Sequence, residues 1–283
     1  MKVTRRALLA AGAGGLVSVA AGGGAVVLGD VPRARRWLHG RGYLDAPGVT
    51  TPDVDVALQV STLRSRHLGR DVTWGMALPA EPSKALLLCL HGRGASHDFA
   101  FDPMNVHRFV AAAALPWAVV AVDGGPVSFW RRRADGTDAQ AMIFEELLPM
   151  LRATLGDVPL GLLGWSMGGY GALLAATDRP DRVDAVVATA PALWRSFSEA
   201  RPGAFDDAAD FEAHDLLRRI DRLGARPLRI DCGADDPLLY VCRSLADRLP
   251  HAERDFGPGF HDADTWRTRL GDQLDFFRRA LAT

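Results

Sequence analysis

Apolar runs of strand length alternate with amphipathic, helix-like segments along most of the chain, and this alternation limits what it can fold into. The runs 84–90 and 117–122 are almost wholly apolar, which is typical of strands buried on both faces of a sheet. Strands are also expected at residues 54–61, 71–79, 160–164, 183–190, 227–231 and 253–256. Helices are expected at residues 137–155, 168–177, 216–223, 238–249 and 264–281.

Strands that alternate with helices favour an α/β fold with a mostly parallel central sheet. We expect about eight strands with helices on both faces, because crossovers between parallel strands are right-handed in nearly all proteins. In such sheets the functional groups gather at the carboxyl ends of the strands. Functional residues are therefore expected directly after the apolar runs.

One serine lies where the strand-like run 160–164 meets a helix rich in small residues. The segment Gly164-Trp165-Ser166-Met167-Gly168 has the form G-x-S-x-G, which at a strand-to-helix turn forms the nucleophile elbow of the α/β-hydrolase fold. The turn strains the backbone at the serine, and the two glycines prevent collisions between flanking side chains. The sequence predicts Ser166 as a nucleophile; an ordinary capping serine in a Gly-rich turn is the alternative.

A serine hydroxyl is a weak nucleophile and needs a base within hydrogen-bond reach. In this fold the chain order is Ser, then Asp or Glu, then His. His261 fits as the base because it lies in the loop between the last expected strand and the last helix. His214 lies beside an irregular insert, and His251 precedes the last strand at its wrong end.

The orienting acid is expected just past the strand 227–231. Asp235 and Asp236 both lie there, and the usual Gly-x-x-Asp pattern of the fold, counted from Gly233, selects Asp236. Asp235 is then expected to be a solvated neighbour. Asp123 also ends a strand, but it precedes the serine and so breaks the chain order.

An acyl-transfer site also needs two N–H donors for the oxyanion. We expect them to be the backbone N–H groups of Met167 and Arg93, the latter in the loop after the run 84–90. The Arg93 side chain is expected to reach a loop carbonyl rather than a substrate carboxylate, and His91 to have a structural hydrogen-bonding role.

Aromatic side chains on strand-end loops are candidates for the substrate pocket. Trp130, Tyr170 and Trp194, with Phe129, flank the expected site. Core packing is an equally good reading for each of them.

These motifs resemble one esterase family of α/β hydrolases over residues 54–282. The resemblance rests on His91-Gly92, the segments 164–171 and 231–237, and His261 with Trp266. The family includes S-formylglutathione hydrolases, feruloyl esterases and the mycobacterial antigen 85 mycolyltransferases. A group of exported actinobacterial α/β hydrolases is the most similar, also over residues 123–149 and 191–210. The resemblance implies carboxylic-ester hydrolysis by Ser166, Asp236 and His261, without cofactor or metal.

The N-terminus has the pattern of an export signal. Lys2, Arg5 and Arg6 precede an apolar stretch that ends at Gly29, and the segment 4–9 resembles a twin-arginine signal. An uncleaved membrane anchor is the alternative, because the stretch is long enough to span a bilayer. We expect residues 1–29 to be signal or anchor, residues 30–53 a linker or lead-in, and residues 54–283 a hydrolase domain outside the cytoplasm.

Composition excludes little but fits a globular enzyme. The formal net charge of −1 gives no indication of a nucleic-acid partner, and three cysteines are too few for a disulfide framework. A small-molecule, lipid or sugar ester is the expected substrate, and the oligomeric state is not indicated. Two other functions remain open: acyl transfer to a sugar or lipid hydroxyl, which uses the same triad, and a non-catalytic binding role in the cell envelope.

Overall fold

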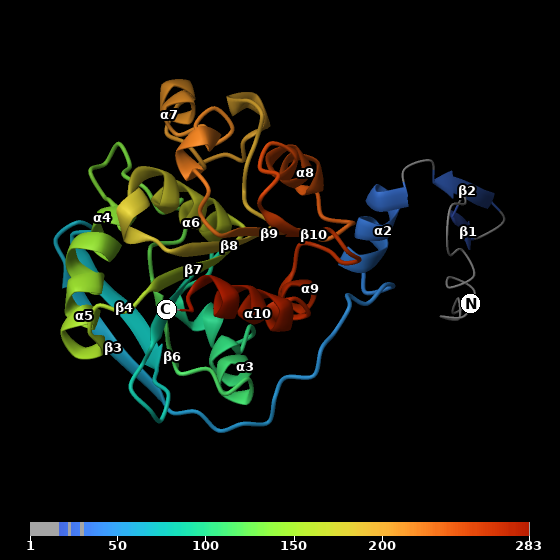
Figure 1. Ribbon diagram of the computed structural model, residues 1–283. Coiled ribbons are helices and arrows are strands. Elements are labelled where there is room, and N and C mark those ends of the chain that lie inside the picture. The colour runs from blue at the N-terminus through green and yellow to red at the C-terminus, as the bar shows by residue number, and fades with distance from the viewer. Residues whose placement is uncertain (1–16, 22–23, 29–30, 283) are drawn as a thin grey trace.

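The computed structural model describes residues 17–21, 24–28 and 31–282 (Figure 1). The expected signal or anchor segment falls largely outside these residues. Within it the structure describes two strands, β1 (Val17–Ala21) and β2 (Gly24–Leu28), which pair antiparallel. Among the residues that are described, no helix combines the length and the apolar character needed to cross a membrane.

The body is built on one eight-stranded sheet with the order β10-β9-β8-β7-β5-β6-β4-β3. Neighbouring strands are parallel from β10 to β6, and β4 and β3 extend the sheet as antiparallel strands at one edge. The α/β fold with a mostly parallel sheet is therefore confirmed. The strands are β3 (Leu58–Ser65), β4 (Arg70–Ala77), β5 (Ala85–Leu90), β6 (Trp117–Val122), β7 (Leu160–Trp165), β8 (Ala185–Thr189), β9 (Leu228–Asp231) and β10 (Glu253–Asp255).

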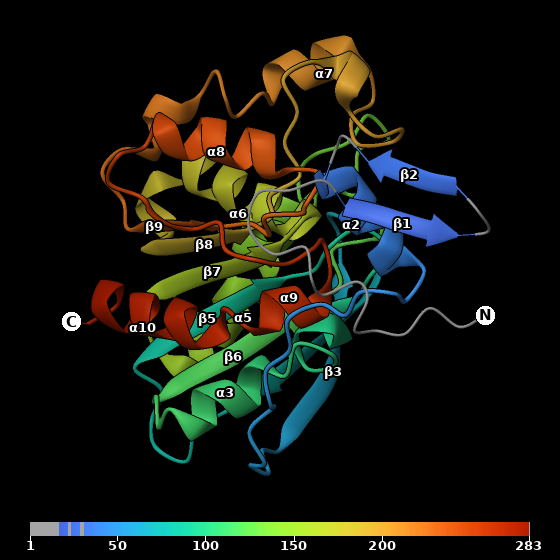
Figure 2. The ribbon, with the colours of Figure 1, turned by 90° about the vertical axis from the view of Figure 1, so that its right-hand side faces the viewer.

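Helices cover both faces of this sheet (Figure 2). One face carries α3 (Val106–Ala112), α9 (Ala263–Arg267) and α10 (Leu270–Ala280). The other carries α4 (Ala139–Ala141), α5 (Leu148–Leu155), α6 (Met167–Asp178) and α8 (Leu239–Asp247). Helix α7 (Ala208–Ala213) lies in the insert, residues 191–213, and α2 (Val31–Gly40) precedes the sheet.

Several elements differ from the sequence-based expectation. The helix expected at 216–223 is a short 3₁₀ helix at Ile220–Leu223, and the helix expected at 264–281 is divided into α9 and α10. Helices α2 and α3 have no counterpart among the expected elements.

The strand expected at 54–61 begins at Leu58, because its partner β4 and the turn before Arg70 set the register of this exposed edge strand, in which Ser65 pairs with Arg70. The helix expected at 137–155 is continuous but contains a π-helical stretch at Met142–Leu147. Pro149 follows at the start of α5 and has no N–H to continue the regular hydrogen-bond ladder.

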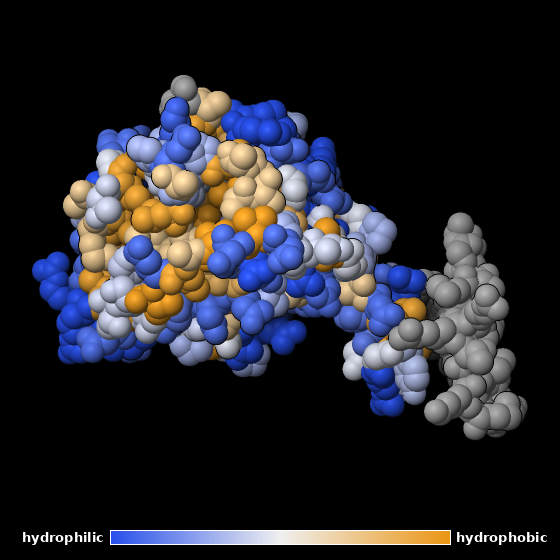
Figure 3. All heavy atoms as spheres, turned by 90° about the horizontal axis from the view of Figure 1, so that it is seen from below, coloured by the Kyte–Doolittle hydropathy of each residue, from blue (hydrophilic) through white to orange (hydrophobic). Residues whose placement is uncertain are grey.

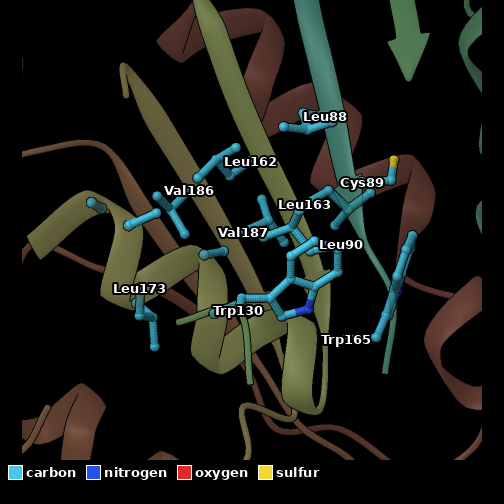
Figure 4. Close-up of a cluster of buried hydrophobic side chains, with 14 of the residues drawn as sticks. Leu88, Cys89, Leu90, Trp130, Leu162, Leu163, Trp165, Leu173, Val186 and Val187 are labelled. Carbon is cyan, nitrogen blue, oxygen red and sulfur yellow. The ribbon is translucent and has the colours of Figure 1, made fainter. Parts of the chain in front are cut away.

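The core lies where the central strands meet α6. All residues of β5, β7 and β8 are buried, so their side chains pack on both faces of the sheet. Figure 4 shows side chains of these strands, including Leu88, Leu162 and Val187, packed together with Trp130. Cys89, Cys232 and Cys242 are buried free thiols.

A cavity of about 570 Å³ lies at the amino ends of the parallel strands, on the opposite side of the sheet from the strand ends that carry Ser166. Trp117 at the start of β6 and Ala77 at the end of the antiparallel β4 line it, together with residues of α3. Figure 3 shows apolar residues gathered on the underside of the body.

His107 on α3 gives the stability a pH dependence that can be measured. Its ring packs edge-on against Phe101, and burial, with a smaller effect of Arg108, holds its pKa below the usual value. The folded state therefore keeps His107 neutral, whereas the unfolded chain takes up a proton below about pH 6.5. The stabilisation is fully present above that pH and is lost as the pH falls toward the lowered pKa.

We expect the free energy of unfolding to fall between about pH 7 and pH 5, and His107→Gln to remove this contribution. Urea unfolding of both proteins at several pH values measures the two slopes. Equal slopes in the two proteins would contradict the assignment to His107.

Candidate active site

Ser166 occupies a strained turn between β7 and α6. Its φ of 53° and ψ of −112° place it in a region that side chains other than glycine rarely adopt. The flanking glycines are sterically required: a Cβ at Gly164 would lie 2.1 Å from the carbonyl oxygen of Gly168, and one at Gly168 would lie 1.8 Å from that of Leu90. The structure therefore has the nucleophile elbow that the motif indicates.

The structure brings Ser166, His261 and Asp236 into one hydrogen-bonded chain. The Nε2 atom of His261 lies 3.0 Å from the Oγ of Ser166, and its Nδ1 lies 2.7 Å from the Oδ2 of Asp236. A carboxylate only accepts, so Nδ1 carries the proton and Nε2 is left to accept from the serine hydroxyl. The Asp236 side chain is fully buried, and its Oδ1 accepts from the N–H of Leu238 at 2.8 Å.

Two loops at the carboxyl ends of neighbouring strands deliver the acid and the base. The acid loop, residues 232–237, follows β9, and the histidine loop, residues 256–262, follows β10. Backbone bonds join them, from the N–H of Ala234 to Gly257 O at 2.8 Å and from the N–H of Asp235 to Gly259 O at 2.9 Å. A Cβ at Gly233 would lie 2.4 Å from Gly259 O, so the close approach of the two loop backbones requires glycine at this position.

Arg269 on the segment between α9 and α10 also links these loops, and sequence reasoning missed it. Its guanidinium is buried and donates to the carbonyls of Cys232 at 3.4 Å and Gly257 at 3.1 Å. No sequence pattern around Arg269 indicates this role, because the carbonyl groups that it binds come together only in the folded chain.

The loop after β5 passes beside the nucleophile. A Cβ at Gly92 would lie 3.7 Å from the Cβ of Ser166, and Arg93 and Met167 line the same cavity as Ser166. Met167 is the first residue of α6, so its N–H has no acceptor within the helix. The two backbone segments expected to supply oxyanion donors thus flank the serine.

The side chains of this loop have the contacts that the sequence favoured. Arg93 donates to the carbonyl of Pro202 at 3.4 Å, and its side chain is exposed. His91 is buried, with Nδ1 2.8 Å from Gly92 O and with Nε2 accepting from the N–H of Gly124 at 3.2 Å. His91 therefore supports the loop after β5 and takes no part in the hydrogen-bonded chain of Ser166, His261 and Asp236.

A cavity of about 930 Å³ opens at Ser166 and His261. Its walls are largely apolar, and Phe129, Trp194, Leu238 and Trp266 contribute to them. Of the two positions left open for Trp194, pocket wall or core, the structure has the first.

Trp130 and Tyr170 were candidates for the pocket wall, with core packing as the alternative, and the structure places both in the core behind the cavity. The ring of Trp130 covers Gly124 and Gly171, where a Cβ would lie 2.3 and 2.4 Å from its atoms, and Nε1 donates to His91 O. Figure 4 shows this ring among the buried side chains. Tyr170 is also buried, with its hydroxyl donating to His214 O at 3.1 Å. The Trp130 side chain fits behind the cavity because Gly124 and Gly171 have no side chain in the space that it occupies.

The insert that carries Trp194 is fixed by a buried arginine. Arg131 binds both carboxylate oxygens of Asp210, at 2.8 and 2.5 Å, and the carbonyl of Ala204 at 3.0 Å. Arg133 pairs with Asp206 at 2.6 Å. Arg131 and Arg133 therefore hold the insert against the body.

The competing candidates are engaged elsewhere. Asp235 was expected to be solvated, but it is buried and its Oδ2 accepts from the Nε of Arg35 at 2.7 Å. His214 lies 2.9 Å from Asp210, and Asp123 pairs with Arg70 at 3.2 Å. Asp235 is buried because α2, in the segment 30–53 expected as linker or lead-in, covers the acid loop.

Across the part of the chain that the structure describes, no group of three or more His, Cys, Asp or Glu side chains could hold a metal ion.

Comparisons with known proteins identify the fold. Residues 85–223 match the family model described as the alpha/beta hydrolase fold. No curated protein matches the chain in sequence. Solved structures are similar to it over most of its length. A ferulic acid esterase has 20% identity and a TM-score of 0.69, with 80% of this chain and 98% of that chain covered.

Two further structures agree. An S-formylglutathione hydrolase from Agrobacterium tumefaciens has 18% identity and a TM-score of 0.67, with 83% and 100% covered. MPT51 of Mycobacterium tuberculosis has 19% identity and a TM-score of 0.66, with 80% and 100% covered. These names match the family that the sequence motifs resemble, and at such identities the similarity establishes the fold.

Proposed function

The chain has the α/β-hydrolase fold, and we propose that it is a serine hydrolase that cleaves carboxylic esters through an acyl-enzyme on Ser166. One observation carries the proposal: the hydrogen-bonded chain from Ser166 through His261 to the buried Asp236, with distances of 3.0 and 2.7 Å, at the floor of a largely apolar cavity. A nucleophile joined to a base that a third group orients is the arrangement used for acyl transfer.

In the first half of the proposed reaction, the Oγ of Ser166 attacks the ester carbonyl while Nε2 of His261 takes its proton. The negative charge of the tetrahedral intermediate is stabilised by the N–H groups of Met167 and Arg93, and each such donor contributes about 10²–10³-fold in rate. The carbon–oxygen bond to the alcohol then breaks, and His261 gives its proton to the leaving oxygen. Asp236 keeps Nδ1 protonated and stabilises the imidazolium.

In the second half, a water molecule attacks the acyl-enzyme carbonyl and His261 takes one of its protons. Collapse of the second tetrahedral intermediate releases the carboxylic acid, and the proton returns from His261 to the Oγ of Ser166. The scheme consumes one ester and one water and yields one acid and one alcohol. The apolar walls at Phe129, Trp194 and Trp266 suit an aliphatic or aromatic acyl or alcohol group.

A covalent probe and a series of substrates test the proposal together. We expect a fluorophosphonate to add to the full-length protein once, at Ser166, and p-nitrophenyl esters from acetate to palmitate to be hydrolysed with a maximum at one chain length. Ser198→Ala is the matched control, since Ser198 is exposed on the insert outside the triad. A folded protein that neither reacts with the probe nor turns over any ester would overturn the proposal.

A further inference from the structure

We infer that α2 is a clasp that holds the acid loop and the histidine loop in their reactive arrangement, with Arg35 and His39 as positioning residues. The inference rests on the proposed function, because the arrangement matters through the triad that these loops carry. Helix α2 lies N-terminal to the residues that match the family model, and it contacts both loops at positions next to triad members. Figure 1 shows it at the end of the sheet where β9 and β10 finish.

The first contact of α2 is with the acid loop. The Nε of Arg35 donates to the Oδ2 of Asp235 at 2.7 Å, and the guanidinium of Arg36 donates to the carbonyl of Asp235 at 3.3 Å. Asp235 immediately precedes Asp236 and is buried. A charge-assisted bond to a buried carboxylate is short and directional, so it fixes the backbone from which the Asp236 side chain extends.

The second contact is with the histidine loop, on both sides of His261. The ring of His39 stacks on Phe260 with centroids 3.9 Å apart and planes 5° apart. Its Nε2 lies 2.7 Å from the Oδ2 of Asp262, whose other oxygen accepts from the N–H of Thr265 at 2.8 Å and caps α9. The residues before and after His261 are thus both held by one side chain of α2.

The clasp has a fixed span because both contacts come from one helical turn. Arg35 and His39 are four residues apart, so their side chains leave the same face about 5–6 Å from each other. Ala34 and Leu38 are buried beside them, whereas Trp37 on the other side is 52% exposed. A helix of 10 residues is unstable alone in water, so these contacts also hold α2 itself in place.

The inner face of the same loops is held by Arg269, which binds the Cys232 and Gly257 carbonyls, and α2 supplies the hold on the outer side. His261 depends on the contacts from Arg269 and from α2, because its side chain is 29% exposed and borders the open cavity, where few packing contacts hold it. A displacement of about 1 Å in a catalytic group can cost about 10²-fold in rate. Loss of the clasp is therefore expected to act on the rate of the chemical step.

The test compares full-length variants by steady-state kinetics on a p-nitrophenyl ester, per mole of sites titrated with a fluorophosphonate. We expect Arg35→Ala/His39→Ala to lower kcat by about 10–100-fold. The KM of this variant should differ from that of the wild type by no more than the KM of the Trp37→Ala control does, and its main unfolding transition should be retained. Trp37→Ala, on the exposed side of the same helix, is the matched control and should keep wild-type kcat. Arg35→Lys/His39→Gln retains the charge at position 35 and a hydrogen-bond donor at position 39, and it should recover part of kcat. Such recovery would show that the loss in the alanine variant comes from these contacts and not from general unfolding.

Each outcome decides a separate question. Wild-type kcat in the double alanine variant overturns the clasp and leaves the proposed function intact. An equal loss of kcat in Trp37→Ala, or a loss of titratable sites with unchanged kcat per site, also overturns it, because the helix then supports folding only. A wild-type protein that shows neither labelling of Ser166 nor turnover overturns the proposed function, and the clasp as a positioning device with it.

Discussion

Replacing Ser166 with alanine is expected to lower kcat for ester hydrolysis by about 10⁶-fold, and His261→Ala by a similar factor. The two side chains act as one unit, since the Nε2 of His261 accepts from the Oγ of Ser166 at 3.0 Å and neither has a use in the reaction without the other. The double variant should therefore be no slower than either single variant. A residual rate above that of water, about 10³–10⁴-fold, should survive through the N–H donors of Met167 and Arg93.

Single-turnover and steady-state kinetics of the three variants measure this non-additivity. Circular dichroism and the unfolding midpoint check that each variant keeps its fold, and Ser198→Ala controls for the loss of a hydroxyl. Losses that multiply in the double variant would show that Ser166 and His261 act independently. A His261→Ala protein with near wild-type kcat would show that another group serves as the base.

Replacing Gly168 with alanine is expected to destabilise the fold by about 4–5 kcal/mol or more, the extreme of the range for point substitutions. The added Cβ would lie 1.8 Å from the carbonyl oxygen of Leu90, which is backbone of the buried strand β5. Neither side can yield without moving β5 or the start of α6. The substitution thus strains the sheet and the nucleophile elbow together.

Urea unfolding and soluble yield measure this effect. Gly271→Ala is the matched control, because no atom apart from its chain neighbours and the nearby backbone of α10 lies within 4 Å of its Cβ position. This substitution should leave stability unchanged or raise it by up to about 1 kcal/mol. A Gly168→Ala protein that unfolds at the same urea concentration as Gly271→Ala would contradict the steric argument. It would also mean that α6 can shift relative to β5 at little cost.

Much of the site could be predicted because its chemistry is tied to local pattern and chain order. Ser166 is marked by two glycines at a strand-to-helix turn, and His261 and Asp236 follow the last strands in the order that the fold requires. The structure places all three in one hydrogen-bonded chain. The pocket was harder: Trp194 lines the cavity, whereas Trp130 and Tyr170 turn into the core. An aromatic residue near a strand end has the same sequence signal in either position.

Local patterns in the sequence were enough to predict the alternation of strands and helices, and with it the parallel sheet and the carboxyl ends of the strands as the place of the site. Apolar runs, glycines and chain order are visible along the chain itself, and their effect on backbone conformation and strand order depends little on tertiary context. The burial of Asp235 against Arg35, the stacking of His39 on Phe260 and the link that Arg269 makes between two loops could not be predicted in this way. These contacts link residues tens to hundreds of positions apart. Their existence depends on which surfaces packing brings together, and no pattern along the chain records that.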